Sequence, residues 1–405
     1  MEEKKNIKIE KILIIYLLFS NMLQIFMIDS KGSTYDTIWK ITVFASLFFY
    51  SLYKSVANNH RISEKYILIW IIYTILIILS NFFNGTLFNI SFNNLISCVY
   101  SPILIFIFVV MFSNVELNEE HIKKYFKYVV FFVLYCCIFS IIYDSKQIAG
   151  FLRISRGYEI NIASFFDNRN TYGLYILYGI ISNIFILDYF KEKKIFYKIT
   201  MAIFCVSALL TLSRTTIFSI IFFVLFLIIK ARKTYTIKRK ILFIFTSLIL
   251  LFIIMQSIEY ISTNILRINS GLTHRDNIWQ YGLNIYKNSN TIVGIGKNEG
   301  LLLLKEKYQV TSFHNTCITI LVSGGILNII ANIIIYGFSI FNIKRIKKYN
   351  LKLYILFLDI FITYLIGSFF ETHELFESSA TSFILTTFIT LLPLYLNNNY
   401  INKQK

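Results

Sequence analysis

Six arginines and one histidine in the polar stretches between long apolar segments are the residues best suited to chemistry. A guanidinium stays charged at physiological pH and its planar fork matches two phosphate oxygens, whereas lysine would serve if only solubility were needed. The pattern therefore predicts a ligand that carries phosphate. For each arginine the alternative is an ion pair with a loop carboxylate or a lipid headgroup. The residues are Arg153, Arg156, Arg169, Arg214, Arg267, Arg275 and His314.

Arg214 lies between two apolar stretches, residues 195–212 and 216–229, that are each a little short for a full crossing of roughly 20 residues. We therefore expect the turn at Ser213 and Arg214 to lie below the membrane surface. A charge at that depth is costly unless it faces a wet cavity or a partner. Arg214 is accordingly a candidate for binding substrate.

A short amphipathic helix is predicted where residues 273–286 read THRDNIWQYGLNIY. Thr273 followed by Asp276 resembles a capping box, and the residues behind it recur at helical spacing. Arg275 and Trp279 share one face of this helix, which could hold a phosphate beside a sugar ring stacked on the indole. The alternative role for this face is anchoring at the membrane interface.

His314 is expected in the first turn of the next membrane helix, followed by Asn315. The N-terminus of a helix carries partial positive charge, which disfavours a protonated imidazole. A neutral His314 can act as a base. The alternatives are that His314 caps the helix or binds a lipid phosphate. A Gly294-Ile295-Gly296 turn precedes it, where glycine permits close approach of the backbone.

Metal and nucleotide motifs are absent from the sequence. The run Glu371-Thr372-His373-Glu374 contains ligand types but lacks the HExxH spacing, so it is interpreted as a solvated turn, with contact to substrate as the alternative. There is no DxD pair, Walker sequence, GxSxG or Rossmann fingerprint, and the five cysteines show no ligand spacing. No metal and no cofactor are predicted.

The elements that must position these residues are membrane helices. Of the 405 residues, 56% are hydrophobic and only 15% are charged, and the mean hydropathy is +0.62, values that exclude a soluble protein of this length. Two prolines leave the apolar runs unbroken, and helices satisfy their own backbone in lipid. The net charge of +18 comes from short lysine runs between apolar segments, a distribution that argues against nucleic acid as a partner.

The sequence predicts an all-α, polytopic bundle of about twelve spans that forms a single integral membrane domain over residues 1–405. Basic clusters fall on alternate connections, which places both termini in the cytoplasm and makes the first apolar run an uncleaved helix. Two long connections face outward, at residues 144–169 and 258–313, and the second precedes the tenth span. The predicted spans are centred near Leu18, Ala45, Tyr73, Phe106, Leu134, Tyr178, Phe204, Phe222, Phe245, Ile329, Leu358 and Leu385.

The order and spacing of these features resemble the O-antigen polymerase and O-antigen ligase family over roughly residues 168–330. Asn168 and Asn170 lie where relatives often show Asn-Pro-Asn, with Arg169 in place of the proline. The features that carry the resemblance are Ser213-Arg214, Arg275 with Trp279, Gly294-Ile295-Gly296, His314-Asn315 and Gly324-Gly325.

The resemblance implies a GT-C-like helical fold and a metal-independent, inverting glycosyl transfer from an undecaprenyl-pyrophosphate-linked glycan. It implies that Arg214 and Arg275 hold the pyrophosphate and that His314 deprotonates the acceptor sugar. The expected activity is polymerisation of repeat units into capsule, O-antigen or exopolysaccharide, at the outer face of a bacterial cytoplasmic membrane. Membrane lipid, a chain-length regulator and a flippase are the expected partners. Further candidates for substrate binding are Arg153, Arg156, Arg169, Arg267, Trp279 and Asn315.

Three alternative functions stay open. A ligase of the same family would move finished glycan to another acceptor instead of extending it. A flippase or transporter would also have many spans and basic cavities, but transporters usually show internal repeats, and the long loop before His314 has no counterpart in the first half of the chain. A receptor or scaffold would have no need of Arg214 within the membrane.

Overall fold

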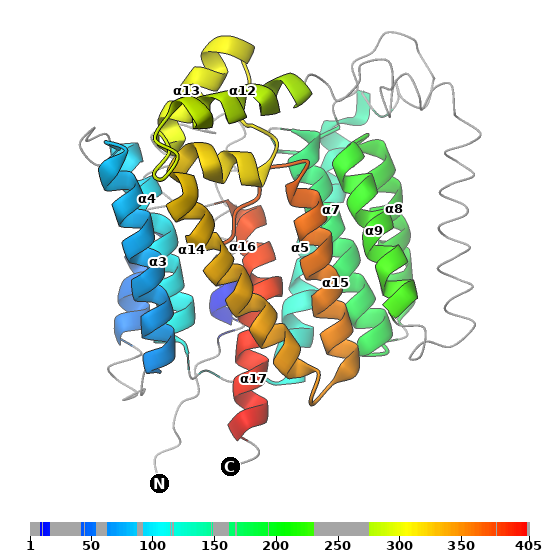
Figure 1. Cartoon of the computed structure of the whole chain (residues 1–405). Coiled ribbons are helices and arrows are strands. Elements are labelled where there is room, and N and C mark those ends of the chain that lie inside the picture. Colours follow the sequence, from blue (N-terminus) through cyan, green and yellow to red (C-terminus); the bar gives the residue numbers. More distant parts are fainter. Residues whose placement is uncertain are drawn as a thin grey trace.

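The computed structural model describes residues 9, 11–16, 42–43, 45–53, 63–86, 92–113, 115, 117–146, 148, 162–166, 168–192, 194–230, 275–377 and 379–402. Within these residues the regular structure is helical throughout, which confirms the predicted all-α class. The helices run side by side through most of their length, and two shorter ones lie across one end (Figure 1).

Five of the described helices are long and apolar enough to cross a membrane. The predicted centres Tyr73, Leu134, Tyr178, Ile329 and Leu358 each lie within one of them. They are α3 (Glu64–Phe83), α5 (Glu119–Tyr143), α7 (Arg169–Ile184) with its π-helical continuation η3 (Phe185–Tyr189), α14 (Thr316–Ile346) and α15 (Leu351–Ser368).

Shorter helices account for four further predicted centres, Phe106, Phe204, Phe222 and Leu385. Ala45 lies in the helical stretch 45–53, whereas Leu18 and Phe245 lie outside the described residues. The number of spans and their orientation stay predictions. The shorter elements are α4 (Phe92–Ile105), η2 (Phe106–Met111), α8 (Ile195–Leu210), α9 (Arg214–Lys230), α16 (Ala380–Thr386), η7 (Thr387–Leu391) and α17 (Leu392–Asn402).

Asparagine caps fix where four of these helices begin. In α5, α7, α14 and α15 the residue before the helix accepts a hydrogen bond on its side-chain oxygen from the backbone N–H three residues later. This bond satisfies one of the N–H groups that every helix leaves without an internal partner. The caps set the registers of α7 and α14, the two helices whose first residues adjoin the site. They are Asn118, Asn168, Asn315 and Asn350.

The end of the bundle opposite the C-terminal end of α17 is covered by α12 (Arg275–Asn288) and α13 (Lys297–Tyr308) (Figure 1). The amphipathic helix predicted at 273–286 is thus present from residue 275, and Thr273 lies outside the described residues. A small apolar core holds both helices against the start of α14. Its buried members are Ile278, Leu304, Phe313, Ile318 and Val322.

α14 is interrupted at Gly325, whose backbone has φ 59° and ψ −151°. The interruption frees backbone groups of residues 322–327, and the loop at 291–296 pairs with them: Ile295 N and Gly296 N donate to the carbonyls of Val322 and Ser323, at 2.9 and 3.0 Å. A break in a membrane helix is tolerated where neighbouring groups satisfy the backbone in this way. The loop before α13 is therefore part of the bundle.

Candidate functional site

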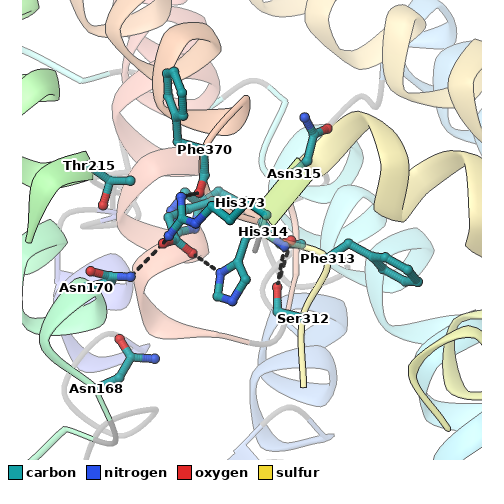
Figure 2. Close-up of polar contacts among 12 residues, drawn as sticks. Asn168, Asn170, Thr215, Ser312, Phe313, His314, Asn315, Phe370 and His373 are labelled. Carbon is teal, nitrogen blue, oxygen red and sulfur yellow. Dashed lines mark hydrogen bonds and ion pairs between the residues drawn. The ribbon is translucent and has the colours of Figure 1, made fainter. Parts of the chain in front are cut away.

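The carboxylate of Glu371, in the loop between α15 and α16, is the hub of the site. Its Oε2 lies 2.9 Å from Nδ1 of His314. Its Oε1 accepts hydrogen bonds from Nη2 of Arg275 at 2.7 Å and from Nδ2 of Asn170 at 2.6 Å. These four side chains come from the Glu371 loop, the start of α7, the start of α12 and the residues before α14. They form one continuous polar cluster (Figure 2).

His314 stands two residues ahead of α14, because Asn315 is the cap and Thr316 is the first helical residue. The prediction that His314 lies in the first turn of the helix is therefore wrong, because His314 immediately precedes the cap residue. Its backbone has φ 51°, a left-handed conformation that is unfavourable for a residue with a Cβ and recurs at functional sites. The Ser312 hydroxyl accepts a hydrogen bond from its N–H at 3.1 Å.

The environment of His314 also differs from the one predicted. Glu371, rather than the helix N-terminus, is the electrostatic partner of the ring. When Nδ1 carries the proton and donates it to the carboxylate, Nε2 is the basic nitrogen. Figure 2 shows the second ring nitrogen directed away from Glu371. The arrangement is that of a histidine oriented by a carboxylate, with one nitrogen left to take a proton.

Arg275 is the first residue of α12, and its guanidinium reaches back to the Glu371 loop. Besides its bond to Glu371, it donates from Nη1 to the carbonyl oxygen of Phe370. The Arg275 side chain is only 15% exposed, and that of Glu371 is 10% exposed, so water screens this ion pair weakly. A guanidinium has five N–H donors, which leaves Arg275 others for a second anion.

The interpretation of the Glu371 to Glu374 run as a solvated turn is wrong. Burial alone raises the pKa of Glu371, but the hydrogen bond from His314 and the charges of His314 and Arg275 outweigh it, so the pKa is lowered and the carboxylate is ionised. Burial lowers the pKa of His373, whose Nε2 is buried without a hydrogen-bond partner in the described part of the chain. Glu371 is thus a functional candidate that the sequence suggested only as the alternative interpretation of this run.

A second ion cluster begins three residues after Glu371. Nζ of Lys297, the first residue of α13, lies 3.0 Å from Oε1 of Glu374 and also contacts Glu377. Burial lowers the pKa of Lys297, but the two carboxylates outweigh it and raise that pKa well above its ordinary value. One loop thus holds the starts of both α12 and α13 by ion pairs, at Glu371 and at Glu374 with Glu377.

The Ser213–Arg214 turn joins the site through Asn170. Oγ of Ser213 donates to Oδ1 of Asn170 at 2.8 Å, and Asn170 in turn donates to Glu371. Ser213 is 1% exposed and Thr216, on the first turn of α9, is fully buried. The turn is therefore enclosed by protein, and its depth in the membrane stays a prediction. Arg214 opens α9 immediately after Ser213 and is partly buried.

The remaining predicted residues are placed less centrally. Trp279 donates from Nε1 to the carbonyl of Phe313 at 3.0 Å, which connects α12 to the segment before His314. Asn315 is 7% exposed, and both of its side-chain polar atoms are bonded, to Ile318 N and to the carbonyl of Phe369. Arg169 begins α7. Arg153, Arg156 and Arg267 lie outside the described residues.

Comparison with protein families gives a match to part of the chain. The sequence model of the family described as O-antigen ligase matches residues 199–333, a segment that includes Arg214, Arg275, His314 and the break in α14. No curated protein matches the chain. The match confirms the resemblance to the O-antigen polymerase and ligase family over this segment. Asn170 and Glu371 lie outside it, so the polar cluster combines matched residues with residues from both flanks.

Proposed function

We propose that this chain, which carries an O-antigen ligase domain at residues 199–333, is a membrane glycosyltransferase that polymerises lipid-linked oligosaccharide repeats into surface polysaccharide. The donor is an undecaprenyl-pyrophosphate-linked glycan, and the transfer inverts the anomeric centre without a metal. The reaction takes place at the outer face of a bacterial cytoplasmic membrane. The apolar helices and the family match support a membrane protein with O-antigen ligase or polymerase function.

The observation that carries this proposal is that Arg275 and His314 bind the two oxygens of the same carboxylate, that of Glu371. Transfer from a lipid diphosphate needs a cation to bind the leaving diphosphate and a base to deprotonate the acceptor. The two groups must lie close enough to act on the same donor glycan. Arginine suits the first task because its remaining N–H donors can bind phosphate oxygens in bidentate fashion. A carboxylate-oriented imidazole suits the second.

In the reaction, Nε2 of His314 takes the proton from an acceptor sugar hydroxyl as that oxygen attacks the anomeric carbon of the donor glycan. A new C–O bond forms on one face of the sugar. The C–O bond to the carrier diphosphate breaks on the other face, and its electron pair leaves with the diphosphate. Arg214 and Arg275 offset the charge that develops there, so no general acid is needed. The developing imidazolium is stabilised by the ionised Glu371.

The charge balance of the cluster indicates how the arginines divide this work. Arg275 is already paired with Glu371, so an arriving diphosphate competes with that carboxylate for the guanidinium. Arg214 stands at the start of α9, where the backbone N–H groups of the helix also favour an anion. We infer that the start of α9 at Arg214 adds to the attraction for the donor, and that Arg275 aligns the donor relative to His314.

A ligase is the second candidate, and the description of the matching family favours it. A ligase would use the same donor and the same base. Its acceptor would be a different molecule, and not another lipid-linked repeat. The products distinguish the two functions. Purified protein supplied only with lipid-linked repeats would yield a ladder of lengthening glycans if it is a polymerase. A ligase would leave the repeats unjoined.

The test uses protein reconstituted in liposomes with the lipid-linked repeats that accumulate in cells lacking this protein. We expect His314→Ala and Arg275→Ala to remain in the membrane in normal amount and to stop chain growth, with only a residual rate of diphosphate-lipid release. The controls are His121→Ala and Lys287→Ala, which remove a histidine and a cation of α12 at sites outside the polar cluster. Full-length product from both site variants would overturn the proposal.

A further inference from the structure

A chain of directed hydrogen bonds connects α9 to Glu371 through Asn170. Thr216 donates from Oγ1 to Oγ of Ser213 at 2.9 Å, Ser213 donates to Oδ1 of Asn170 at 2.8 Å, and Asn170 donates from Nδ2 to Oε1 of Glu371 at 2.6 Å. Every donor points towards the carboxylate. Chains of this kind strengthen each bond by polarisation, most of all when they end on a charge.

The packing around this chain leaves the two helices little freedom. Gly173, three residues after Asn170 on α7, faces Thr216 so closely that a Cβ would lie 2.0 Å from the threonine hydroxyl. Ser213 and Thr216 are buried. The start of α9 therefore cannot move relative to α7 without breaking the bonds of Asn170. Arg214 is carried on the same turn.

We propose that Asn170 is a positioning residue that sets both halves of the site, holding Glu371 in the orientation that serves His314 and fixing the turn that presents Arg214. This inference rests on the proposed function. Asn170 touches neither donor nor acceptor and acts through the two groups that it binds. Its amide is suited to the place because it accepts from Ser213 on one side and donates to a carboxylate on the other.

The electrostatic consequence can be measured as a pH dependence. Glu371 faces Arg275 from α12, His314 from the segment before α14, and His373 of its own loop. A hydrogen bond donated by Asn170 favours the ionised carboxylate, as does each positive neighbour. In Asn170→Ala that bond is lost, so Glu371 takes up a proton at a higher pH. The activity of Asn170→Ala relative to wild type should then fall as the pH decreases.

Asn170→Asp should show the opposite dependence. At high pH it places a second carboxylate against Glu371, and the two repel. As the pH decreases the pair shares a proton, and the protonated aspartic acid donates to Glu371 as the amide does. Its activity relative to wild type should therefore rise between about pH 8 and about pH 6, while that of Asn170→Ala stays level there and falls only below about pH 6, as Glu371 begins to take up a proton. If Asn170 were merely structural, the activity of each Asn170 variant relative to wild type would not change with pH.

The experiment measures release of undecaprenyl diphosphate by full-length protein in liposomes, with the lipid-linked repeats as substrate. We expect Asn170→Ala to lower the rate about tenfold to a hundredfold at neutral pH. Ser213→Ala, which removes the bond to Oδ1 and the bonds that Thr216 donates to the serine but keeps the bond from Asn170 to Glu371, should show the same sign and a smaller loss. Asn81→Ala and Asn81→Asp are the matched controls, since the Asn81 amide donates to the carbonyl of Ile77 in its own helix, away from the polar cluster.

The inference would be overturned if the activity of both Asn170 variants relative to wild type did not change with pH. It would also be overturned if Asn170→Ala reacted at the wild-type rate. Membrane abundance and thermal unfolding of each variant are recorded in parallel, and Ser213→Ala provides the milder change if Asn170→Ala fails to fold. His314→Ala in the same assay separates the two hypotheses. If it keeps its activity, the proposed function fails; if it is inactive while the relative activities of the Asn170 variants do not change with pH, only the role of Asn170 fails.

Discussion

Nδ1 of His314 and Oε2 of Glu371 are 2.9 Å apart although 57 residues separate them in the sequence. The contact brings the segment before α14 against the loop after α15. Arg275 binds the other oxygen of the same carboxylate at 2.7 Å. A single glutamate thus determines where a guanidinium and an imidazole lie relative to one another. Glu371 is therefore the residue whose substitution is most informative.

Glu371→Gln is expected to lower kcat about tenfold to a hundredfold, because a neutral amide orients His314 but does not stabilise its imidazolium. The same change frees Arg275 from its carboxylate. The donor KM should therefore stay the same or decrease. Steady-state kinetics with varied donor concentration measure both effects. A raised donor KM with unchanged kcat would contradict this role.

The Glu371 cluster also makes stability depend on pH. The pKa of Glu371 in the folded protein is lowered from its ordinary value of 4.5, so its contribution to stability is present above that value and lost as the pH falls through the lower folded-state value. Acidification below pH 4.5 should lower the melting temperature of wild type more than that of Glu371→Gln. Thermal unfolding in detergent measures this difference. Equal losses in the two proteins would contradict it.

Gly325→Ala is expected to destabilise the protein by about 1–3 kcal/mol. Gly325 has a positive φ, and a Cβ there would lie 2.5 Å from the carbonyl carbon of Ile292 in the loop at 291–296. Gly337→Ala is the matched control on the same helix, since among the described residues no atom outside the local backbone of that helix lies within 4 Å of its added Cβ. The control should be neutral or stabilising by up to about 1 kcal/mol. Thermal or denaturant unfolding compares the two.

Lys297→Met should destabilise the attachment of α13 by about 2 kcal/mol, because it leaves Glu374 and Glu377 without their cation. The Lys297 side chain is 30% exposed, so the loss should be smaller than for a fully buried pair. The triple variant with Glu374→Gln and Glu377→Gln should recover part of that loss. Proteolysis between α12 and α13 reports the attachment. A triple variant that is cleaved faster than Lys297→Met would contradict this account.

Sequence reasoning found the components of the site that leave a local pattern. Arg275 and Trp279 recur at helical spacing, and Arg214 interrupts apolar stretches, so both features are visible in the sequence. The long apolar helices follow from composition in the same way. His314 was placed within two residues of its position because an apolar run begins after it.

The components that were missed depend on contacts between distant segments. Glu371 and Asn170 stand 201 residues apart, and nothing in either neighbourhood requires them to meet. The isolated acidic run at Glu371 resembled a solvated turn, since burial of a carboxylate becomes favourable only with a cation such as Arg275 in place. A usable signal was charge complementarity between this acidic run and the arginines.

The double-mutant cycle of His314→Ala and Glu371→Gln tests the central claim most directly, with the rate of undecaprenyl diphosphate release as the measurement. If the two residues act as one base, the double variant will be no slower than His314→Ala alone, because the glutamate works only through the histidine. Two independent losses that multiply in the double variant, or a His314→Ala protein that releases diphosphate at the wild-type rate, would contradict the account.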